Sequence, residues 1–184
     1  MSSILAERPL VCHPDTPCDA LVALGARIIL RDDHGWDVEF VAVGDPAALR
    51  IPSPAEAIRT DDLWRTTCFE LFLALDGDAY AELNVSPSSA WAAYHFDHYR
   101  TGMRELALPS PRTQLLVQHE RLVLTASLSE DALPWDRTGE LGISAVIEEQ
   151  DGRLSYWALA HPPGKPDFHH RDCFAQRLPP VERA

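Results

Sequence analysis

Residues 63–73 read LWRTTCFELFL, residues 80–87 read YAELNVSP, and residues 91–100 read WAAYHFDHYR. In each segment apolar residues alternate with polar or aromatic ones, and this period of two is typical of β-strands that bury one face. Turn-forming residues separate the segments, with Asp-Gly-Asp at 76–78 and Ser-Pro-Ser-Ser at 86–89. The three segments therefore predict successive strands of a sheet.

Other apolar segments extend this pattern along the chain. Further strands are predicted at 20–31, 36–43, 113–119, 122–128, 141–148 and 154–160, and single helical turns at 53–57 and 129–133. Roughly ten short strands with frequent turns are typical of an all-β fold, and no long helical period is present. We predict an antiparallel two-sheet β-sandwich, jelly-roll or immunoglobulin-like. It forms a single domain over residues 1–184, with its core at about 20–178.

The charge of the chain argues against two classes of partner. Its 28 acidic residues outnumber its 16 lysines and arginines, so the formal net charge is −12, and Lys165 is the only lysine. Such a surface repels nucleic-acid backbones and anionic membranes. Residues 1–9 lack the apolar core of a signal peptide, and no apolar run reaches membrane-spanning length. We therefore expect a cytoplasmic protein that binds neither nucleic acid nor membrane; its oligomeric state stays open.

The four cysteines, Cys12, Cys18, Cys68 and Cys173, form no CxxC pair and match no zinc-ligand spacing. In a reducing compartment we expect four free thiols. Cys12 and Cys18 are close enough in sequence for a disulfide to remain the alternative.

Several sequence elements occur in the order found in one known family. They are Trp64 with Phe-Glu-Leu-Phe at 69–72, Glu-x-Asn-x-Ser-Pro at 82–87, and Trp-x-x-Tyr-x-Phe from 91 leading into Tyr-Arg-x-Gly-Met at 99–103. Tyr-Trp-Ala-Leu-Ala-His at 156–161 and Pro-Asp-Phe-His at 166–169 follow. Over about residues 21–178 the chain resembles stand-alone bacterial DOMON-like domains, which are grouped with family 9 carbohydrate-binding modules. The resemblance implies a jelly-roll-like sandwich that binds sugar in some branches and haem in others.

The resemblance also implies particular site residues. In the sugar-binding branch a tryptophan and a glutamate six residues later hold a terminal sugar, and Trp64 and Glu70 have this spacing. That branch has a second stacking tryptophan near its C-terminus. Here the corresponding stretch has Phe168, His169 and His170, with Trp157 earlier, which departs from the pattern for recognising cellulose or xylan.

Sugar recognition requires an aromatic ring against the apolar face of a pyranose and polar side chains that bind its hydroxyls. Glu70 lies opposite the apolar face of its strand, so we expect it to be accessible, and Glu82 and Asn84 share a face. We predict a non-catalytic domain that binds a saccharide-like ligand, without a cofactor. The candidate ligand-binding residues are Trp64, Glu70, Glu82, Asn84, Trp91, Arg100, Trp157 and His169. Alternatively, these are ordinary strand and core residues.

Three further alternatives remain. His161, His169, His170 and Asp172 offer imidazole and carboxylate groups for a transition metal, although their spacing matches no established site. The resemblance also implies haem as an alternative cofactor, with Met103 and either His161 or His169 as axial ligands. A third alternative is an interaction module without a small ligand. An enzyme is the least favoured class. Glu70 and Glu82 could form a glycosidase pair, but nothing distinguishes them from binding carboxylates, and no GxSxG, nucleotide-binding or cysteine–histidine motif is present.

Overall fold

The computed structural model describes residues 2–130, 132 and 139–178. These residues form twelve strands, whose ladders are all antiparallel, and three short 3-10 turns. No helix among them is long and apolar enough to cross a membrane. The strands are β1 (Ser3–Cys12), β2 (Leu21–Leu30), β3 (Trp36–Gly44), β4 (Cys68–Ala74), β5 (Tyr80–Val85), β6 (Trp91–Phe96), β7 (Arg104–Glu105), β8 (Arg112–Gln118), β9 (Arg121–Leu128), β10 (Glu140–Glu148), β11 (Leu154–Ala158) and β12 (Gln176–Arg177). The turns are η1 (Pro46–Ala48), η2 (Leu63–Arg65) and η3 (Arg171–Cys173).

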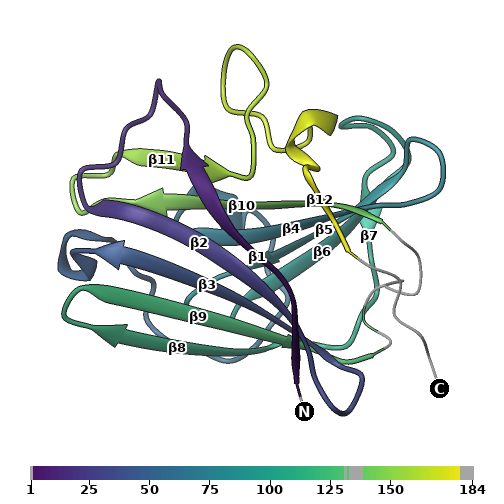
Figure 1. Cartoon of the computed structure of the whole chain (residues 1–184), viewed down its shortest axis with the longest axis horizontal. Coiled ribbons are helices and arrows are strands. Elements are labelled where there is room, and N and C mark those ends of the chain that lie inside the picture. Colours follow the sequence, from purple (N-terminus) through teal and green to yellow (C-terminus); the bar gives the residue numbers. More distant parts are fainter. Residues whose placement is uncertain (1, 131, 133–138, 179–184) are drawn as a thin grey trace.

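The strands join into one curled sheet. Their order is β7-β6-β5-β4-β10-β11-β1-β2-β3-β9-β8, and β12 pairs with β10. Strand β1 connects the two halves, because Ser3–Leu10 pairs with β2 whereas Val11 and Cys12 pair with β11. Figure 1 shows the half that contains β2, β3, β9 and β8 lying in front of the half that contains β10, β4, β5 and β6. The all-β antiparallel prediction is confirmed. The prediction of two separate sheets is not confirmed, because a single long strand, β1, belongs to both halves.

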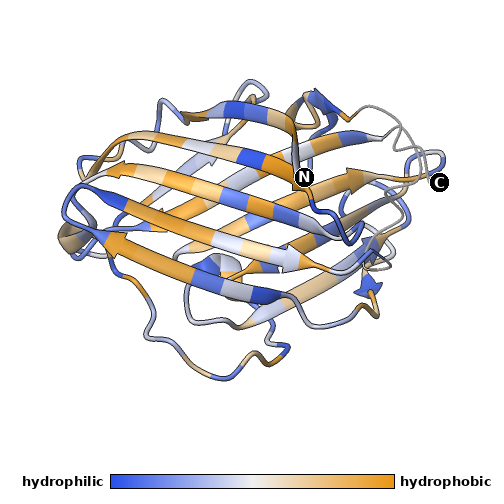
Figure 2. Ribbon diagram, turned by 60° about the horizontal axis from the view of Figure 1, so that its bottom comes forward, coloured by the Kyte–Doolittle hydropathy of each residue, from blue (hydrophilic) through white to orange (hydrophobic). Residues whose placement is uncertain are grey.

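The main core lies between the two halves of the sheet. Alternate residues of each strand point into it, and Figure 2 shows the resulting bands of hydrophobic and hydrophilic positions along the strands. The ring of Phe40 on β3 lies 4.8 Å from that of Phe69 on β4, between centroids, and both rings are fully buried. Apolar burial of this kind is the main source of folding free energy.

A second apolar cluster covers the opposite face of β4, β5, β6, β10 and β11. Phe72, Tyr80 and Phe96 contribute to it from the sheet, and Phe168 and Phe174 pack over them from the C-terminal segment. This face would ordinarily be exposed to water in a sheet with a single core. Both faces of these strands are therefore buried, and this determines the environment of the candidate site.

The predicted strands all form, but β1 and the two-residue strands β7 and β12 are not predicted. Strand β1 is not predicted, because Pro9 and the adjacent Glu7 and Arg8 interrupt its apolar pattern. The helical turn predicted at 53–57 is wrong: these residues have no regular structure, and the turns lie at 46–48 and 63–65. The turn predicted at 129–133 includes residues 131 and 133, which lie outside the described residues.

All four cysteines are free thiols in this structure, as expected. Cys68 and Cys173 are buried, and Cys12 and Cys18 are half-buried. Burial, with a smaller contribution from the nearby Cys18, raises the pKa of the Cys12 thiol. A raised pKa leaves less of the reactive thiolate, so Cys12 is a poor nucleophile.

Candidate functional site

A cluster of polar side chains lies on the sheet face that the second apolar cluster covers. The ladder places Glu70 of β4 between Asn84 of β5 and Ser144 of β10, with Glu82 two residues before Asn84. We call these four residues the carboxylate cluster. The Nδ2 of Asn84 donates to Oε1 of Glu82 at 2.7 Å, and the hydroxyl of Ser144 donates to Oε2 of Glu70 at 3.3 Å. The buried Oδ1 of Asn84 has no hydrogen-bond partner among the described residues.

Both carboxyl groups of the cluster have raised pKa values. Burial, reinforced by the charge of Glu82, raises the pKa of Glu70 well above its usual range. Burial raises the pKa of Glu82 to about 7, although the hydrogen bond from Asn84 and the positive charge of Arg100 act to lower it. Desolvation disfavours the ionised form of each acid. The pair therefore holds a proton at pH values where exposed carboxyl groups are ionised, and it presents a hydroxyl donor beside acceptor oxygens.

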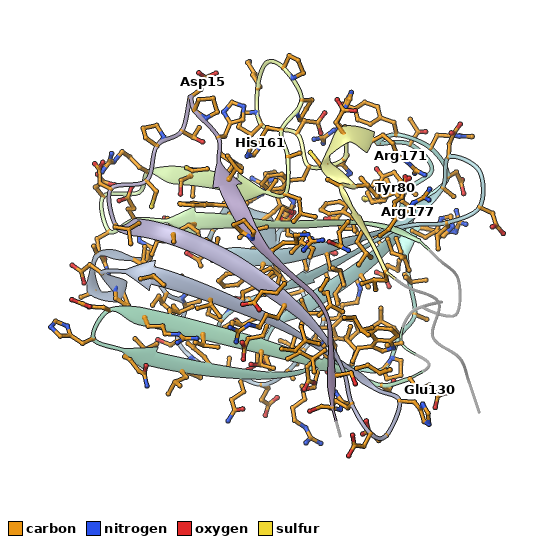
Figure 3. The ribbon with its side chains drawn as sticks, viewed as in Figure 1. Asp15, Tyr80, Glu130, His161, Arg171 and Arg177 are labelled. Carbon is orange, nitrogen blue, oxygen red and sulfur yellow. The ribbon has the colours of Figure 1, made fainter. Side chains whose placement is uncertain are left out.

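His169 lies over the cluster from the C-terminal segment. Figure 3 shows Tyr80 below the turn that carries Arg171, and the Tyr80 hydroxyl lies 2.8 Å from Nδ1 of His169. The same hydroxyl accepts the backbone N–H of Arg100 at 3.1 Å, so its own proton is donated to Nδ1. The proton of His169 is then on Nε2, which lies 3.9 Å from Oε2 of Glu82. Burial lowers the pKa of His169 to about 4, so this contact is not an ion pair at neutral pH.

Replacing Tyr80 with phenylalanine is expected to lower the free energy of unfolding by about 1–2 kcal/mol, because the Arg100 amide and the His169 ring both lose a hydrogen-bond partner. Denaturant unfolding measures the change. Tyr99→Phe is the matched control: its hydroxyl donates to Asp167, but the side chain is exposed, so a smaller loss is expected. Equal stability of Tyr80→Phe and wild type would contradict the assigned hydrogen bonds.

Arg100 lies at the edge of this covered region. Its backbone is left-handed, with φ of 53°, and its half-exposed guanidinium donates from Nη2 to Oδ1 of Asp167 at 2.8 Å. Asp167 also accepts the backbone N–H of His169 at 3.2 Å. The ion pair thus joins the loop after β6 to the C-terminal segment. A groove beside this pair has a volume of about 360 Å³.

Trp64 lies on η2, which packs beside β4 and β5. Its neighbour Leu63 packs against the second apolar cluster, so η2 lies on the same face of the sheet as Glu70. The Trp64 side chain remains 47% exposed, with the Arg65 guanidinium 5.0 Å from its ring centroid. An aromatic ring of this exposure is available to a ligand.

The structure corrects the expected exposure of Glu70. The residue does lie opposite the core-facing Phe69 and Leu71, as predicted. It is nevertheless only 3% exposed, because η2 and the C-terminal segment both pack on that face. Glu82 and Asn84 share the face, as predicted, and are also buried.

Trp91 and Trp157 are not brought to this face. Trp91 pairs with Val85, and Trp157 pairs with Ala145; these residues point into the main core, where both indoles are buried. The Nε1 of Trp157 donates to the Ser155 hydroxyl at 3.0 Å. Neither ring is therefore available to a ligand on the outer face.

The histidine set proposed for a metal does not converge. His161 donates from Nε2 to the carbonyl of Val11 at 2.8 Å, whereas His170 lies 3.5 Å from Asp172 and caps η3. Among the residues that the structure describes, no group of three or more His, Cys, Asp or Glu side chains is arranged to hold a metal ion.

The donor set does not fit a haem with Met103 and a histidine as axial ligands. Met103 is exposed in the connection between β6 and β7. Nδ1 of His169 is hydrogen-bonded to Tyr80 and its Nε2 faces Glu82. Nε2 of His161 is bonded to a backbone carbonyl, and its Nδ1, although it has no partner among the described residues, is buried and therefore closed to an iron. An axial histidine needs a free ring nitrogen directed at the iron.

The sequence pattern did not single out Ser144, Tyr80 or Asp167 as site residues. Two of them carry a usable signal, because alternation places every second residue of a strand on the same face. Tyr80 precedes Glu82 by two, and Ser144 alternates with the core-facing Ile143 and Ala145. Asp167 lies in a loop, and its contact with Arg100, 67 residues away, has no local signal.

No protein-family model matches the chain. No curated protein matches it either. Among solved structures, it is similar to a suggested carbohydrate-binding protein from Bacteroides uniformis ATCC 8492, with 13% identity, a TM-score of 0.63, and coverage of 93% of this chain and 84% of that one. It is also similar to a family 9 carbohydrate-binding module from Caldicellulosiruptor kristjanssonii in complex with cellotriose, with 10% identity, a TM-score of 0.50, and coverage of 87% and 75%. In fold, the chain is therefore a β-domain like the family 9 carbohydrate-binding modules.

Proposed function

We propose that this chain is a non-catalytic saccharide-binding domain in which Trp64 stacks against a sugar ring. The observation that carries the proposal is the exposed indole of Trp64 on the same sheet face as the carboxylate cluster. Indole rings bind the apolar face of a pyranose, and nearby polar groups select its hydroxyls. The fold shared with carbohydrate-binding structures supports the same conclusion.

Of the polar side chains near the proposed site, some are exposed and others are covered. Arg100 is half-exposed and supplies direct hydrogen-bond donors beside the groove. Glu70, Glu82 and Asn84 lie beneath His169 and its segment. A hydroxyl that takes the place of the His169 ring beside Glu82 would meet two carboxyl groups and the free Oδ1 of Asn84. An unsatisfied buried acceptor is costly, so a ligand hydroxyl that pairs with it gains affinity.

The proposal contains no catalytic step. Glycosidases hold two carboxyl groups on either side of the scissile bond, one as acid and one as base or nucleophile. Here Glu70 and Glu82 lie on adjacent strands of one face, and both are buried. This arrangement favours binding over bond cleavage.

Replacing Trp64 with alanine is expected to weaken saccharide binding about 30-fold, equivalent to about 2 kcal/mol for loss of a central aromatic contact. Isothermal titration with cellotriose, preceded by a thermal-shift screen of mono- and disaccharides, measures this effect. Trp64→Phe keeps an aromatic face and should retain most of the affinity. Because Trp64 is half-exposed, both variants should unfold at nearly the wild-type temperature. No thermal shift of the wild type with any saccharide would overturn the proposal.

A further inference from the structure

A groove with a volume of about 360 Å³ lies between the loop after β6 and the segment that follows β11. We call it the C-terminal groove. Its lining consists of Arg100, Lys165, Asp167, His170 and the three prolines of residues 162–166. In Figure 1 this segment rises above β11 as the yellow-green loop that leads into η3. The volume is within the range of about 300–1,000 Å³ that is typical of small-molecule sites.

The net charge of the groove is opposite in sign to the net charge of the whole protein. Asp167 is its only carboxylate, and Arg100 neutralises it at 2.8 Å. Lys165 is the only lysine of a chain whose net charge is −12. It forms no ion pair with any of the described residues, and its ammonium is therefore uncompensated. Two cations against one acid leave the groove with an excess positive charge, which favours an anion there.

The loop that carries Lys165 is held in place before any ligand binds. Nδ1 of His13 accepts the backbone N–H of Asp15, so the ring proton is on Nε2, which donates to the carbonyl of Gly164 at 2.9 Å. His13 is almost fully buried. Pro163 and Pro166 restrict the backbone on either side of this anchor. A pre-ordered loop presents the ammonium with little loss of conformational entropy on binding.

Arg100 joins the groove to the proposed saccharide site. Its guanidinium lines the groove beside Asp167, and its positive charge acts on both Glu70 and Glu82 of the carboxylate cluster. We propose that the C-terminal groove binds the anionic group of an acidic saccharide, a carboxylate or a phosphate ester, between the Lys165 ammonium and the Arg100 guanidinium. Charge-assisted hydrogen bonds from these two groups are shorter and stronger than hydrogen bonds between neutral groups. This inference rests on the proposed function, because it names the class of sugar.

The test is isothermal titration of the full chain with D-glucose, D-glucuronate and D-glucose 6-phosphate at low salt. We expect one of the two acids to bind about tenfold more tightly than glucose, and the two acid arms show whether carboxylate or phosphate is the preferred group. Lys165→Glu should remove the preference, and Lys165→Arg should retain it. Arg8→Glu makes the same change of charge at an exposed residue of β1, and should leave the preference unaltered.

Three results would overturn the inference: no preference for either acid in the wild type, a preference that survives Lys165→Glu, or an equal loss in Arg8→Glu. The results that would contradict the proposed function differ from those that would contradict the groove inference. If an acid binds through Lys165 and Trp64→Ala has no effect, the groove inference stands and the stacking site fails. If glucose binding depends on Trp64 but neither acid is preferred, only the groove inference fails. If the wild type binds none of the three sugars, the groove inference fails, and the cellotriose titration then decides the proposed function.

Discussion

Replacing Phe69 with alanine is expected to lower the free energy of unfolding by about 3–5 kcal/mol. The ring is fully buried on β4, and its centroid lies 4.8 Å from that of Phe40 on β3. These strands belong to opposite halves of the curled sheet. The truncation therefore opens a cavity between two halves that are each restrained by their own hydrogen-bonded ladder, and neither half can move to fill it. Denaturant unfolding of both proteins measures the difference.

Val22→Ala is the matched control, because Val22 is 80% exposed on β2 and surface truncations usually change stability by less than about 0.5 kcal/mol. A Phe69→Ala variant that lost less than about 1 kcal/mol would show that the two halves do not share a close-packed core.

Replacing Glu82 with glutamine is expected to raise the free energy of unfolding at pH 8 by about 3 kcal/mol. The pKa of Glu82 is about 7 in the folded chain, against 4.5 for an exposed carboxyl, and each pKa unit corresponds to about 1.4 kcal/mol. Glutamine keeps an oxygen that accepts the Asn84 hydrogen bond, and it has no charge to desolvate. The increase should be visible in denaturant unfolding curves recorded at pH 8.

The direction of the expected change in stability follows from the titration of Glu82 in the folded and the unfolded chain. Between pH 4.5 and 7 the unfolded chain ionises Glu82 while the folded chain retains the proton, so the wild type loses stability as the pH rises through this interval. Below pH 4.5 the side chain is protonated in both states, and the variant and the wild type should be equally stable. Glu56→Gln, on an exposed residue, should show no such difference. A gain for Glu82→Gln that is equal at pH 4 and pH 8 would contradict the raised pKa.

Burial of two acids without a counter-charge of their own destabilises this fold at neutral pH. Buried ionisable groups with shifted pKa values concentrate at functional sites, where the cost is retained because the groups act on a ligand. If Glu82→Gln is more stable and also binds saccharide more weakly, the same side chain will account for both effects. Titration of that variant with cellotriose measures the second one.

The alternation of side chains was sufficient to predict most of the strands and the face of each strand on which the polar residues lie. The sequence placed Glu82 and Asn84 on one face, and Glu70 opposite Phe69, because successive side chains of a strand point in opposite directions whatever the rest of the chain does. It did not predict β1, whose Pro9 lacks an N–H for the ladder. Strand β1 nevertheless joins the two halves of the sheet.

The tertiary structure alone decided which of the two faces is covered, and by what. His169 and Phe174 follow the sheet residues that they bury by about ninety positions, and Lys165 reaches Arg100 only because that segment folds back over the sheet. Local periodicity specifies the side of a strand on which a residue lies, but burial depends on segments far away in sequence. For that reason the chain by itself determined a β-domain with acids and an indole on one face, and only the folded protein showed those acids buried, the indole exposed and a cationic groove beside them.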